Sequence, residues 1–433
     1  MNVFLDTVGC RLNQSEIETY ARQFRTAGHR LVGKMEEADM MVLNTCSVTA
    51  AAASDSRQKM RQAHKQGIEE IVVTGCLSTL QPEEIMGMPG VVKIVSNQVK
   101  DDLVPDLLQI DFNEFDLEPI SRERIPGSRV RTRAFIKVQD GCENKCTFCI
   151  TTVARGEGRS RSIEAIVSDI RSATKANAQE VVLTGVHLGS WGYDLEESQH
   201  LRNLIQKILE VTDVPRLRIS SLEPWDLNEE FFDLWQDRRL CRHLHLPLQS
   251  GSASTLRRMA RKVTPDSFEN LVTAARNRIS DVAITTDIIA GFPGETEAEF
   301  AETVAFVEKM DFAGAHVFTY SEREGTAAAT MPDQVHNFTR KERNQRLREI
   351  TDRSAESFRN RFIGQEVNVL WESVKAGDKG QWRINGLTDN YLRVQAEVSQ
   401  PIQNQITQTK LIELKGGGLH GKVLSLPDSI LVG

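Results

Sequence analysis

The sequence predicts an α/β protein with three successive parts: a doubly wound parallel sheet, a partial (βα)6 barrel and a small antiparallel β-barrel. Two series of short apolar strands that alternate with amphipathic helices predict the first two parts. After about residue 361 the pattern changes to short strands separated by Gly, Asp and Asn, which predicts the third part. We place the parts at residues 1–120, 128–360 and 361–430.

The first series contains four short strands with helical patterns between them, for example over Ser15–Ala27. An acidic run over residues 101–118 and the turn Ile125-Pro126-Gly127 then mark a boundary. The expected strands are Val3–Val8, Met40–Asn44, Ile71–Thr74 and Val91–Val95.

The second series contains six βα units, two short of a closed eight-fold barrel, so a partial barrel is expected. Its active face should lie at the carboxyl ends of the strands. The expected strands are Ala134–Val138, Glu180–Leu183, Leu217–Ser220, Leu244–Leu246, Val282–Ile289 and Ala315–Phe318. The third part should contain Gln365–Glu372, Gly380–Asn385, Leu392–Gln395, Thr407–Leu414 and Gly421–Leu426.

The composition limits the classes of protein to which this chain can belong. The 433 residues are 40% hydrophobic and 26% charged, and no apolar run reaches the roughly 18 residues of a membrane helix. The chain opens on a strand pattern instead of an export signal, so we expect a cytoplasmic protein without a membrane segment. The net charge of −7 argues against indiscriminate nucleic-acid binding. Basic residues nevertheless cluster over 122–137 and 340–361, where they could contact phosphate or form solvated faces.

Seven cysteines are an odd number, and in a reducing compartment they indicate metal or reactive sites instead of a disulfide framework. Cys142, Cys146 and Cys149 have the spacing C-x3-C-x2-C, which lets one loop place three thiolates around one metal centre. Three thiolates leave one position open on an iron–sulfur cluster. A zinc site completed by Cys241 or His187 is the alternative.

Three further cysteines each follow a predicted strand of the first sheet. Because the carboxyl ends of neighbouring parallel strands meet at one crevice, Cys10, Cys46 and Cys76 should project into one pocket. We interpret them as a second three-thiolate site, with three buried small hydrophobic residues as the alternative. Cys241 has no spaced partner and is assigned to packing.

Together these segments resemble the radical S-adenosylmethionine (SAM) methylthiotransferase family over essentially the whole chain. The resemblance implies an N-terminal methylthiotransferase domain, a radical SAM barrel and a C-terminal TRAM-like RNA-binding domain. It implies two 4Fe–4S clusters, one on Cys10, Cys46 and Cys76 and a catalytic, SAM-binding one on Cys142, Cys146 and Cys149.

The resemblance also implies residues that contact SAM or RNA. Phe148 stands at the aromatic position before the last cluster cysteine, and the other candidates lie at the ends of barrel strands. The expected SAM contacts are Phe148, Thr184, Gly185, Ser220, Glu223, Gln249, Asp287 and Gly291. The expected RNA contacts are Arg155, Arg340, Arg343 and Arg346.

The flanks of the first cysteines, Val8-Gly9-Cys10-Arg11-Leu12-Asn13 and Asn44-Thr45-Cys46-Ser47-Val48-Thr49, look most like the branch that acts on N6-threonylcarbamoyladenosine in tRNA. The resemblance implies an enzyme that adds a methylthio group at adenine C2 beside the anticodon, using two SAM molecules. It also implies an external one-electron donor such as a flavodoxin-like protein.

Alternatives are a ribosomal-protein or isopentenyladenosine methylthiotransferase and, in another class, a non-catalytic RNA-binding protein with structural zinc. Two segments depart from the family pattern, Thr151-Thr152 and Tyr320–Thr326, which lack the usual prolines. We expect both to border the substrate pocket.

Overall fold

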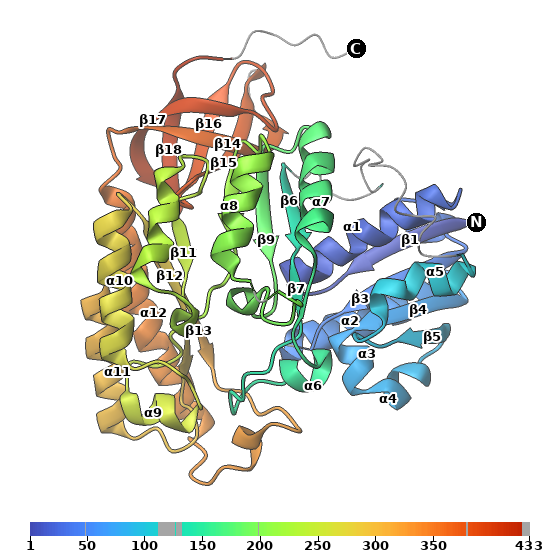
Figure 1. The fold of residues 1–433 in the computed structure, drawn as a ribbon, viewed down its shortest axis with the longest axis horizontal. Coiled ribbons are helices and arrows are strands. Elements are labelled where there is room, and N and C mark those ends of the chain that lie inside the picture. The colour runs from blue at the N-terminus through green and yellow to red at the C-terminus, as the bar shows by residue number, and fades with distance from the viewer. Residues whose placement is uncertain (48, 111–125, 127–131, 198, 378–379, 427–433) are drawn as a thin grey trace.

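The computed structural model describes residues 1–47, 49–110, 126, 132–197, 199–377 and 380–426 (Figure 1). The predicted boundary around Ile125, the domain limits at 120, 128 and 430, and the candidate phosphate contacts Arg122, Arg124, Arg129 and Arg131 lie outside the described residues.

The N-terminal part is a parallel sheet of order β2-β1-β3-β4-β5 with helices on both faces. All six residues of β3 are buried, because helices cover both of its sides. The four predicted strands are confirmed to within one residue at each end, and β2 was not predicted. The elements are β1 Asn2–Thr7, α1 Arg11–Thr26, β2 Arg30–Leu31, β3 Met40–Thr45, α2 Ala50–Lys65, β4 Glu70–Gly75, α3 Cys76–Leu80, α4 Pro82–Met86, β5 Val91–Val95 and α5 Leu103–Leu108.

The central part confirms the six predicted barrel strands, all parallel to their neighbours. They form the sheets β10-β9-β6 and β11-β12-β13, which parallel bridges join between β10 and β11. The strands are β6 Arg133–Lys137, β9 Glu180–Thr184, β10 Leu217–Ile219, β11 His243–His245, β12 Ala283–Ala290 and β13 Gly314–Thr319, with the short pair β7 Gln139–Asp140 and β8 Arg159–Ser160.

Helices follow the barrel strands and bury their apolar faces on them in one continuous core. They are α7 Ile163–Lys175, α8 Leu201–Val211, α9 Ala253–Arg258, α10 Pro265–Arg278, α11 Glu297–Met310 and α12 Asn337–Asn360. The short α6 Thr151–Arg155 packs instead against α3 of the N-terminal part. Short 3₁₀ segments lie at Met35–Glu37, Lys100–Asp102, Leu188–Ser190, Pro224–Asp226, Glu229–Gln236 and Ala327–Thr330. None of the helices in the described part of the chain is long and apolar enough to cross a bilayer.

The C-terminal part is a closed five-strand barrel of order β14-β15-β16-β18-β17, as predicted. One detail differs from a purely antiparallel barrel: β16 and β18 pair in parallel. Closure removes unpaired strand edges, and Trp371 fills the interior. The strands are β14 Glu366–Ala376, β15 Trp382–Thr388, β16 Arg393–Val398, β17 Ile406–Lys415 and β18 Gly418–Val423.

This small barrel docks at the amino ends of the central strands, away from the end at which Cys142 follows β7 (Figure 1). Arg218 is fully buried, pairs with Glu180 at 2.7 Å and donates to the carbonyl oxygens of Thr388 and Asp389 at 3.1 and 2.9 Å. Tyr391 adds a second link, because its hydroxyl accepts from Arg11 of the N-terminal part at 2.7 Å. The buried Arg218 therefore joins the central and C-terminal parts, and the half-buried Arg11 joins the N-terminal and C-terminal parts.

We expect Arg218→Ala to lower the free energy of unfolding at neutral pH by about 3–5 kcal/mol, because Glu180 then remains buried without its cation. Burial disfavours the charged Glu180 carboxylate and would raise its pKa. The charge of Arg218 outweighs this effect, so the pKa of Glu180 is lowered. In the wild type this stabilisation is present above the unfolded pKa of about 4.3 and is lost as the pH falls. Urea unfolding at several pH values should show the two proteins converging in acid.

Arg383→Ala is the matched control, since Arg383 pairs with Glu397 on the exposed face of the same small barrel. An exposed pair contributes at most about 1 kcal/mol. Equal losses in the two variants would contradict the assignment of Arg218 as the joint between the parts.

Candidate active site

The structure brings the loops of Cys10, Cys46 and Cys76 together at the carboxyl edge of the first sheet. Cys10 precedes α1, Cys46 follows β3 and Cys76 begins α3, and the strands β1, β3 and β4 are adjacent. Gly9 has φ of +108°, and a Cβ there would lie 2.6 Å from Cys46 Sγ. Gly75 has φ of +98° and packs against the backbone before Cys46. The absence of side chains at these two glycines lets the loops touch.

A buried cation stands beside this triplet. Arg155, the last residue of α6, is 2% exposed, and its Nη2 donates to Asn13 Oδ1 at 2.7 Å. The same oxygen accepts from Cys10 Sγ at 3.4 Å, and Asn97 Nδ2 lies 3.7 Å from Cys76 Sγ. The surrounding protein partly desolvates the Cys10 thiol and raises its pKa although the residue keeps exposed surface, and the charge of Arg155 opposes that rise. Arg155 therefore favours the thiolate, which is the form that binds metal.

The second triplet lies on one loop between β7 and α6. Gly141 opens it with φ of +77°, in a position where a Cβ would overlap the carbonyl of residue 157. The loop is anchored where Cys142 N donates to Gly156 O at 3.0 Å and turns where Cys149 N donates to Cys146 O at 3.0 Å. The backbone thus holds the three cysteines at the carboxyl end of the central barrel.

This triplet also has a neighbouring guanidinium. Arg261 Nη1 lies 3.7 Å from Cys146 Sγ, and its Nη2 donates to Glu223 Oε2 at 2.7 Å. The guanidinium stacks on Trp225, 4.4 Å from the ring centre. Burial raises the pKa of Cys146, and Arg261 opposes the rise. Each triplet therefore has its own arginine.

A histidine pair borders the same loop. His187 Nε2 lies 2.6 Å from the Asp226 carboxylate, and Asn144 Nδ2 lies 3.3 Å from the other ring nitrogen. Burial disfavours the imidazolium, but hydrogen bonds to Asp226 and Cys142 raise the pKa of His187 to about 9. The Asp226 carboxylate and Cys142 therefore favour the protonated form of His187.

The donor chemistry at both places suits iron–sulfur clusters. Among the described residues, no three Cys, His, Asp or Glu side chains are arranged to hold a single metal ion. In a 4Fe–4S cluster each thiolate binds a different iron, so three thiols at separate loop positions are the appropriate ligand set. The arginine beside each triplet stabilises the negative charge of thiolate ligands.

The structure groups the candidate SAM residues around the second triplet, at the carboxyl ends of the barrel strands. Thr184 ends β9, and Gly185 lies against Gln139, at a position where a Cβ would be 3.1 Å from Gln139 Oε1. That oxygen accepts from the backbone N–H groups of Val186 and His187 at 3.1 and 2.9 Å. Gln139 thus fixes the turn that presents Thr184 and Gly185.

Ser220 and Glu223 follow β10. Ser220 Oγ is buried and has no hydrogen-bond partner in the part of the chain that the structure describes. A buried hydroxyl is usually satisfied, so this atom suits a polar ligand. Glu223 is oriented by Arg261, which in turn lies beside Cys146.

The remaining candidates lie near β12. Gln249 has φ of +77°, and its N–H donates to Asp287 O at 2.8 Å. The Asp287 carboxylate lies 3.3 Å from His245 Nε2. Gly291 packs against Arg340, with a Cβ there 2.5 Å from Arg340 Cγ, and Phe148 packs on a small apolar cluster with Phe292. The strand-end arrangement is confirmed, and the contacts of these residues with SAM stay predictions.

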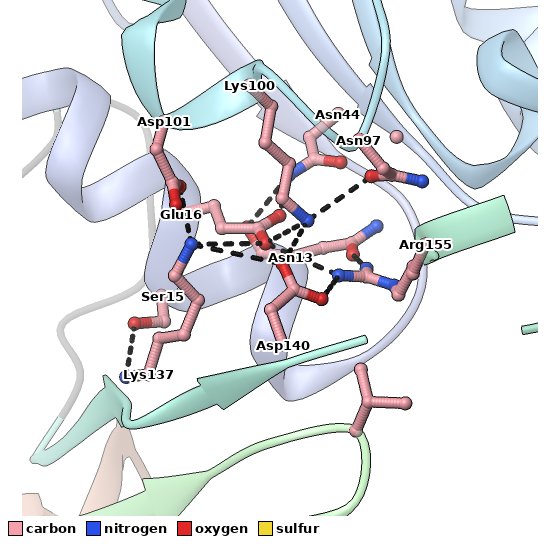
Figure 2. A network of polar contacts seen from close by, with 12 residues as sticks. Asn13, Ser15, Glu16, Asn44, Asn97, Lys100, Asp101, Lys137, Asp140 and Arg155 are labelled. Carbon is pink, nitrogen blue, oxygen red and sulfur yellow. Dashed lines mark hydrogen bonds and ion pairs between the residues drawn. The ribbon is translucent and has the colours of Figure 1, made fainter. Parts of the chain in front are cut away.

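A buried network of ion pairs joins the N-terminal part to the strand that precedes the second triplet (Figure 2). Lys100 pairs with Glu16 at 2.6 Å and with Asp140 at 2.7 Å, and Arg155 pairs with Asp140 at 2.8 Å. Burial opposes the charge of Asp140, but Arg155 and Lys100 hold its pKa well below the usual range. Lys137 adds a pair with Asp101 at the edge of the network. The network connects α1, which follows Cys10, to β7, which precedes Cys142.

Two of the four candidate RNA contacts are corrected by the structure. Arg155 belongs to the buried network, and Arg343 is 5% exposed and pairs with Glu295 and Glu297. Side chains enclosed in ion pairs cannot reach a phosphate at the surface. Arg340 is largely covered too, because it lies on Tyr320 and donates to Gln334 at 2.9 Å. Arg346 is exposed on α12, and its contact with RNA stays a prediction.

Sequence reasoning missed several residues of the site. Gln139, Asp140 and Arg261 each hold a loop or an ion pair beside the cysteines. Gln139 and Asp140 directly precede the loop of the second triplet. Polar residues at the end of a buried strand could have been recognised as part of the site from the sequence. Arg261 lies far along the chain, in a basic run that resembles an ordinary helix end, and offered no such signal.

Two family profiles match the chain. The Radical SAM superfamily matches residues 136–307, and an uncharacterized protein family, UPF0004, matches residues 2–97. The first match covers the barrel with the second triplet, and the second covers the sheet with the first triplet. The two profiles thus separate the N-terminal sheet from the central barrel.

Curated relatives match nearly the whole length. The chain is 35% identical to a Bacillus subtilis protein named threonylcarbamoyladenosine tRNA methylthiotransferase MtaB, covering 95% of this chain and 94% of the relative. A Thermotoga maritima protein of the same name is 35% identical, with 86% of each chain covered. An Acetivibrio thermocellus protein named tRNA-2-methylthio-N(6)-dimethylallyladenosine synthase is 32% identical, with 97% and 90% covered.

Among solved structures, the chain resembles the radical SAM methyltransferase TsrM from Kitasatospora setae, with a TM-score of 0.56 and 15% identity. The match covers 73% of this chain and 72% of that one. At this identity the likeness concerns the fold.

We expect Arg155→Ala to lower the free energy of unfolding by about 3–5 kcal/mol, because Asp140 and Glu16 lose a buried cation. Arg155→Lys should recover part of this loss, since it keeps the charge and gives up the two-pronged geometry. Urea unfolding followed by circular dichroism would measure both.

The control for Arg155 is Arg353→Ala, which removes an exposed guanidinium 4.0 Å from Glu308 and should change stability by less than about 1 kcal/mol. A loss for Arg155→Ala no larger than that of the control would show that the network does not hold the domains together.

Proposed function

The chain belongs to the tRNA methylthiotransferase family of radical SAM enzymes, and from this membership we propose that it adds a methylthio group at C2 of N6-threonylcarbamoyladenosine in tRNA. The observation that carries the proposal is the convergence of two cysteine triplets on one junction between domains. A reaction that joins sulfur to an unactivated ring carbon needs both a radical source and a sulfur source within reach of the base.

Cys142, Cys146 and Cys149 would hold the 4Fe–4S cluster that binds SAM, and Cys10, Cys46 and Cys76 would hold a second one. When bound, the first cluster supplies the electron that cleaves SAM, and the second supplies the sulfur for transfer. The chain's own part is positioning: Gly9, Gly75 and the buried network fix the distance between the triplets.

The residues at the strand ends would orient SAM. Ser220 Oγ offers an unused buried hydroxyl, and Thr184 and Gly185 are presented by the turn that Gln139 holds. Glu223, Gln249 and Asp287 add polar groups at the same end of the barrel. We assign the adenine side of SAM to Phe148 and Gly291.

The substrate base would enter from RNA. An adenosine beside the anticodon lies in a single-stranded loop, where leaving the stack is least costly. The C-terminal barrel and the exposed Arg346 are candidates for holding the rest of the tRNA. A flavodoxin-like protein would supply electrons.

The identity of the base is the finer part of the proposal. Relatives at similar identity are named for threonylcarbamoyladenosine and for dimethylallyladenosine. The residues that flank Cys10 and Cys46 favour threonylcarbamoyladenosine. A ribosomal-protein substrate is the further alternative within the same chemistry.

Nucleoside mass spectrometry of tRNA from a deletion strain tests the substrate. We expect loss of the methylthio form of threonylcarbamoyladenosine, with its unmethylthiolated form accumulating, and restoration by the wild-type gene. Loss of methylthio-isopentenyladenosine instead, or an unchanged tRNA profile, would contradict the assignment.

We expect Cys146→Ala to abolish SAM cleavage, whereas Cys46→Ala should leave cleavage partly intact and stop methylthio transfer. The reason is that the two cysteines lie on separate triplets with separate tasks. Anaerobic assays of 5′-deoxyadenosine and of methylthio product would measure the two activities, and Cys241→Ala, a buried cysteine outside both triplets, is the control. Equal loss of both activities in both variants would contradict the division.

Metal content gives an independent check of the ligand sets. Anaerobically purified wild type and Cys241→Ala should contain about eight irons with sulfide, and Cys46→Ala and Cys146→Ala about half of that. Zinc without sulfide would support the non-catalytic alternative.

A further inference from the structure

A cavity of about 540 Å³ opens where the N-terminal domain meets the central barrel. This volume lies within the range of about 300–1,000 Å³ usual for small-molecule sites. Its walls come from α2 and α3 on one side and from α6 and the loop after β13 on the other. Of the two segments that depart from the family pattern, Tyr320–Thr326 contributes to the lining, and Thr151-Thr152 lies between the lining residues Ile150 and Val153.

The cavity reaches the sequence neighbours of both cysteine triplets. Ser47, Leu77 and Ile150 line it, and these residues directly follow Cys46, Cys76 and Cys149. An occupant of the cavity therefore lies against residues that adjoin the first and the second triplet.

The lining is divided between apolar and charged groups. Leu77, Leu80, Ile150 and Val153 provide apolar surface, which suits a flat base or an aliphatic stem. The charged groups are Arg57 from α2 and Glu322, Arg323 and Glu324 from the loop after β13.

Arg57 is held in place at the cavity wall. Its Nε and Nη2 donate to Glu84 at 2.7 and 3.1 Å, and its Nη2 donates to Gln81 at 2.7 Å. A guanidinium carries five N–H donors in a rigid fork, so these bonds fix the group without using all of its capacity. Arg57 is thus oriented before any ligand arrives.

The opposite wall is also fixed. Thr326 N and Oγ1 both donate to the Arg323 carbonyl, at 3.1 and 2.7 Å, which locks the loop that carries Arg323. On the same loop, Glu322 lies 3.8 Å from Arg340. The loop therefore presents Arg323 and Glu324 from a defined backbone.

One residue of the lining carries a buried polar atom without a partner among the residues that the structure describes. Ser47 is 8% exposed, and its Oγ has no hydrogen-bond partner in the described part of the chain. A buried hydroxyl without a partner is uncommon, so this atom indicates a ligand that hydrogen-bonds here.

We propose that this cavity binds the N6 substituent of the substrate adenosine, with Arg57 and Arg323 on the substituent's carboxylate and Ser47 on its polar stem. The inference rests on the proposed function. In adenine, C2 and C6 flank N1 on one edge of the ring, so a base with C2 toward the triplets directs its N6 group into the neighbouring space. Glu322 and Glu324 can accept from the amide N–H or hydroxyl of a threonylcarbamoyl group.

The same walls disfavour a hydrocarbon substituent. An isopentenyl group would cover Arg57, Arg323 and Glu324 and remove water from them without offering any hydrogen bond in return. A threonylcarbamoyl group replaces that water with a carboxylate and several polar atoms. The cavity would therefore select between the two kinds of adenosine.

The test uses the holoenzyme and three anticodon stem–loop RNAs that differ in one nucleoside: threonylcarbamoyladenosine, its neutral carboxamide analogue, and isopentenyladenosine. Arg57→Gln and Arg323→Gln are compared with the wild type and with Arg61→Gln, an exposed arginine one turn further along α2. We measure methylthio transfer and, separately, equilibrium binding of each RNA.

In the wild type and in Arg61→Gln, we expect the carboxylate RNA to bind about 10- to 100-fold more tightly than the carboxamide RNA. In Arg57→Gln and Arg323→Gln this preference should shrink several-fold, because a neutral amide cannot use the missing guanidinium. The rate of 5′-deoxyadenosine formation without RNA should not change.

Two failures are distinguishable. If the wild type does not modify the threonylcarbamoyladenosine RNA, the proposed function is overturned, and the cavity assignment falls with it. If the wild type modifies it while both variants keep the full preference for the carboxylate, only the cavity assignment is overturned. Arg57→Lys, which keeps the charge, provides a folded variant should the glutamine form be unstable.

Discussion

Glu16, Lys100, Asp140 and Arg155 form a buried network on which the arrangement of the two domains depends (Figure 2). Charges removed from water are stabilised only by close partners in good geometry, so the network tolerates little relative movement of the elements that carry it. Those elements are α1, the segment before α5, β7 and α6. Two of them border cysteines: Cys10 immediately precedes α1, and Cys142 follows β7 by one residue. The network thereby transmits its rigidity to both triplets.

The electrostatics of the cysteines follow from this arrangement. Burial alone raises the pKa of Cys10 and Cys146, which disfavours the thiolates that metal binding requires. Arg155 opposes this effect at the first triplet and Arg261 at the second. Arg155 takes part in both the ion-pair network and the electrostatics of the cysteines. Its guanidinium pairs with Asp140 of the central barrel, and its charge acts on Cys10 and Cys76. An arginine of the central domain thus favours the thiolate form of the cysteines in the N-terminal domain.

The junction also creates the cavity in which the substituent of the base is proposed to lie. Neither domain encloses that space alone, since α2 and α3 form one wall and α6 with the loop after β13 forms the other. The C-terminal barrel is attached at the opposite ends of the central strands through Arg218 and Tyr391 (Figure 1). A tRNA that reaches both the cavity and this barrel would have to extend along the central domain.

The sequence by itself determined the strands, their order along the chain and the six cysteines, because buried parallel strands are short apolar runs and their carboxyl ends meet at one edge. It also supplied the family, through motifs that remain contiguous. Only the tertiary structure decided which charged side chains are buried. Arg343 is enclosed and Arg346 is exposed although both belong to one basic helix and both lie over Phe300 of α11, because Arg343 is held between Glu295 and Glu297. Similarly, Arg57 and Arg323 are separated by most of the chain, and a local pattern cannot register that folding places them on one cavity.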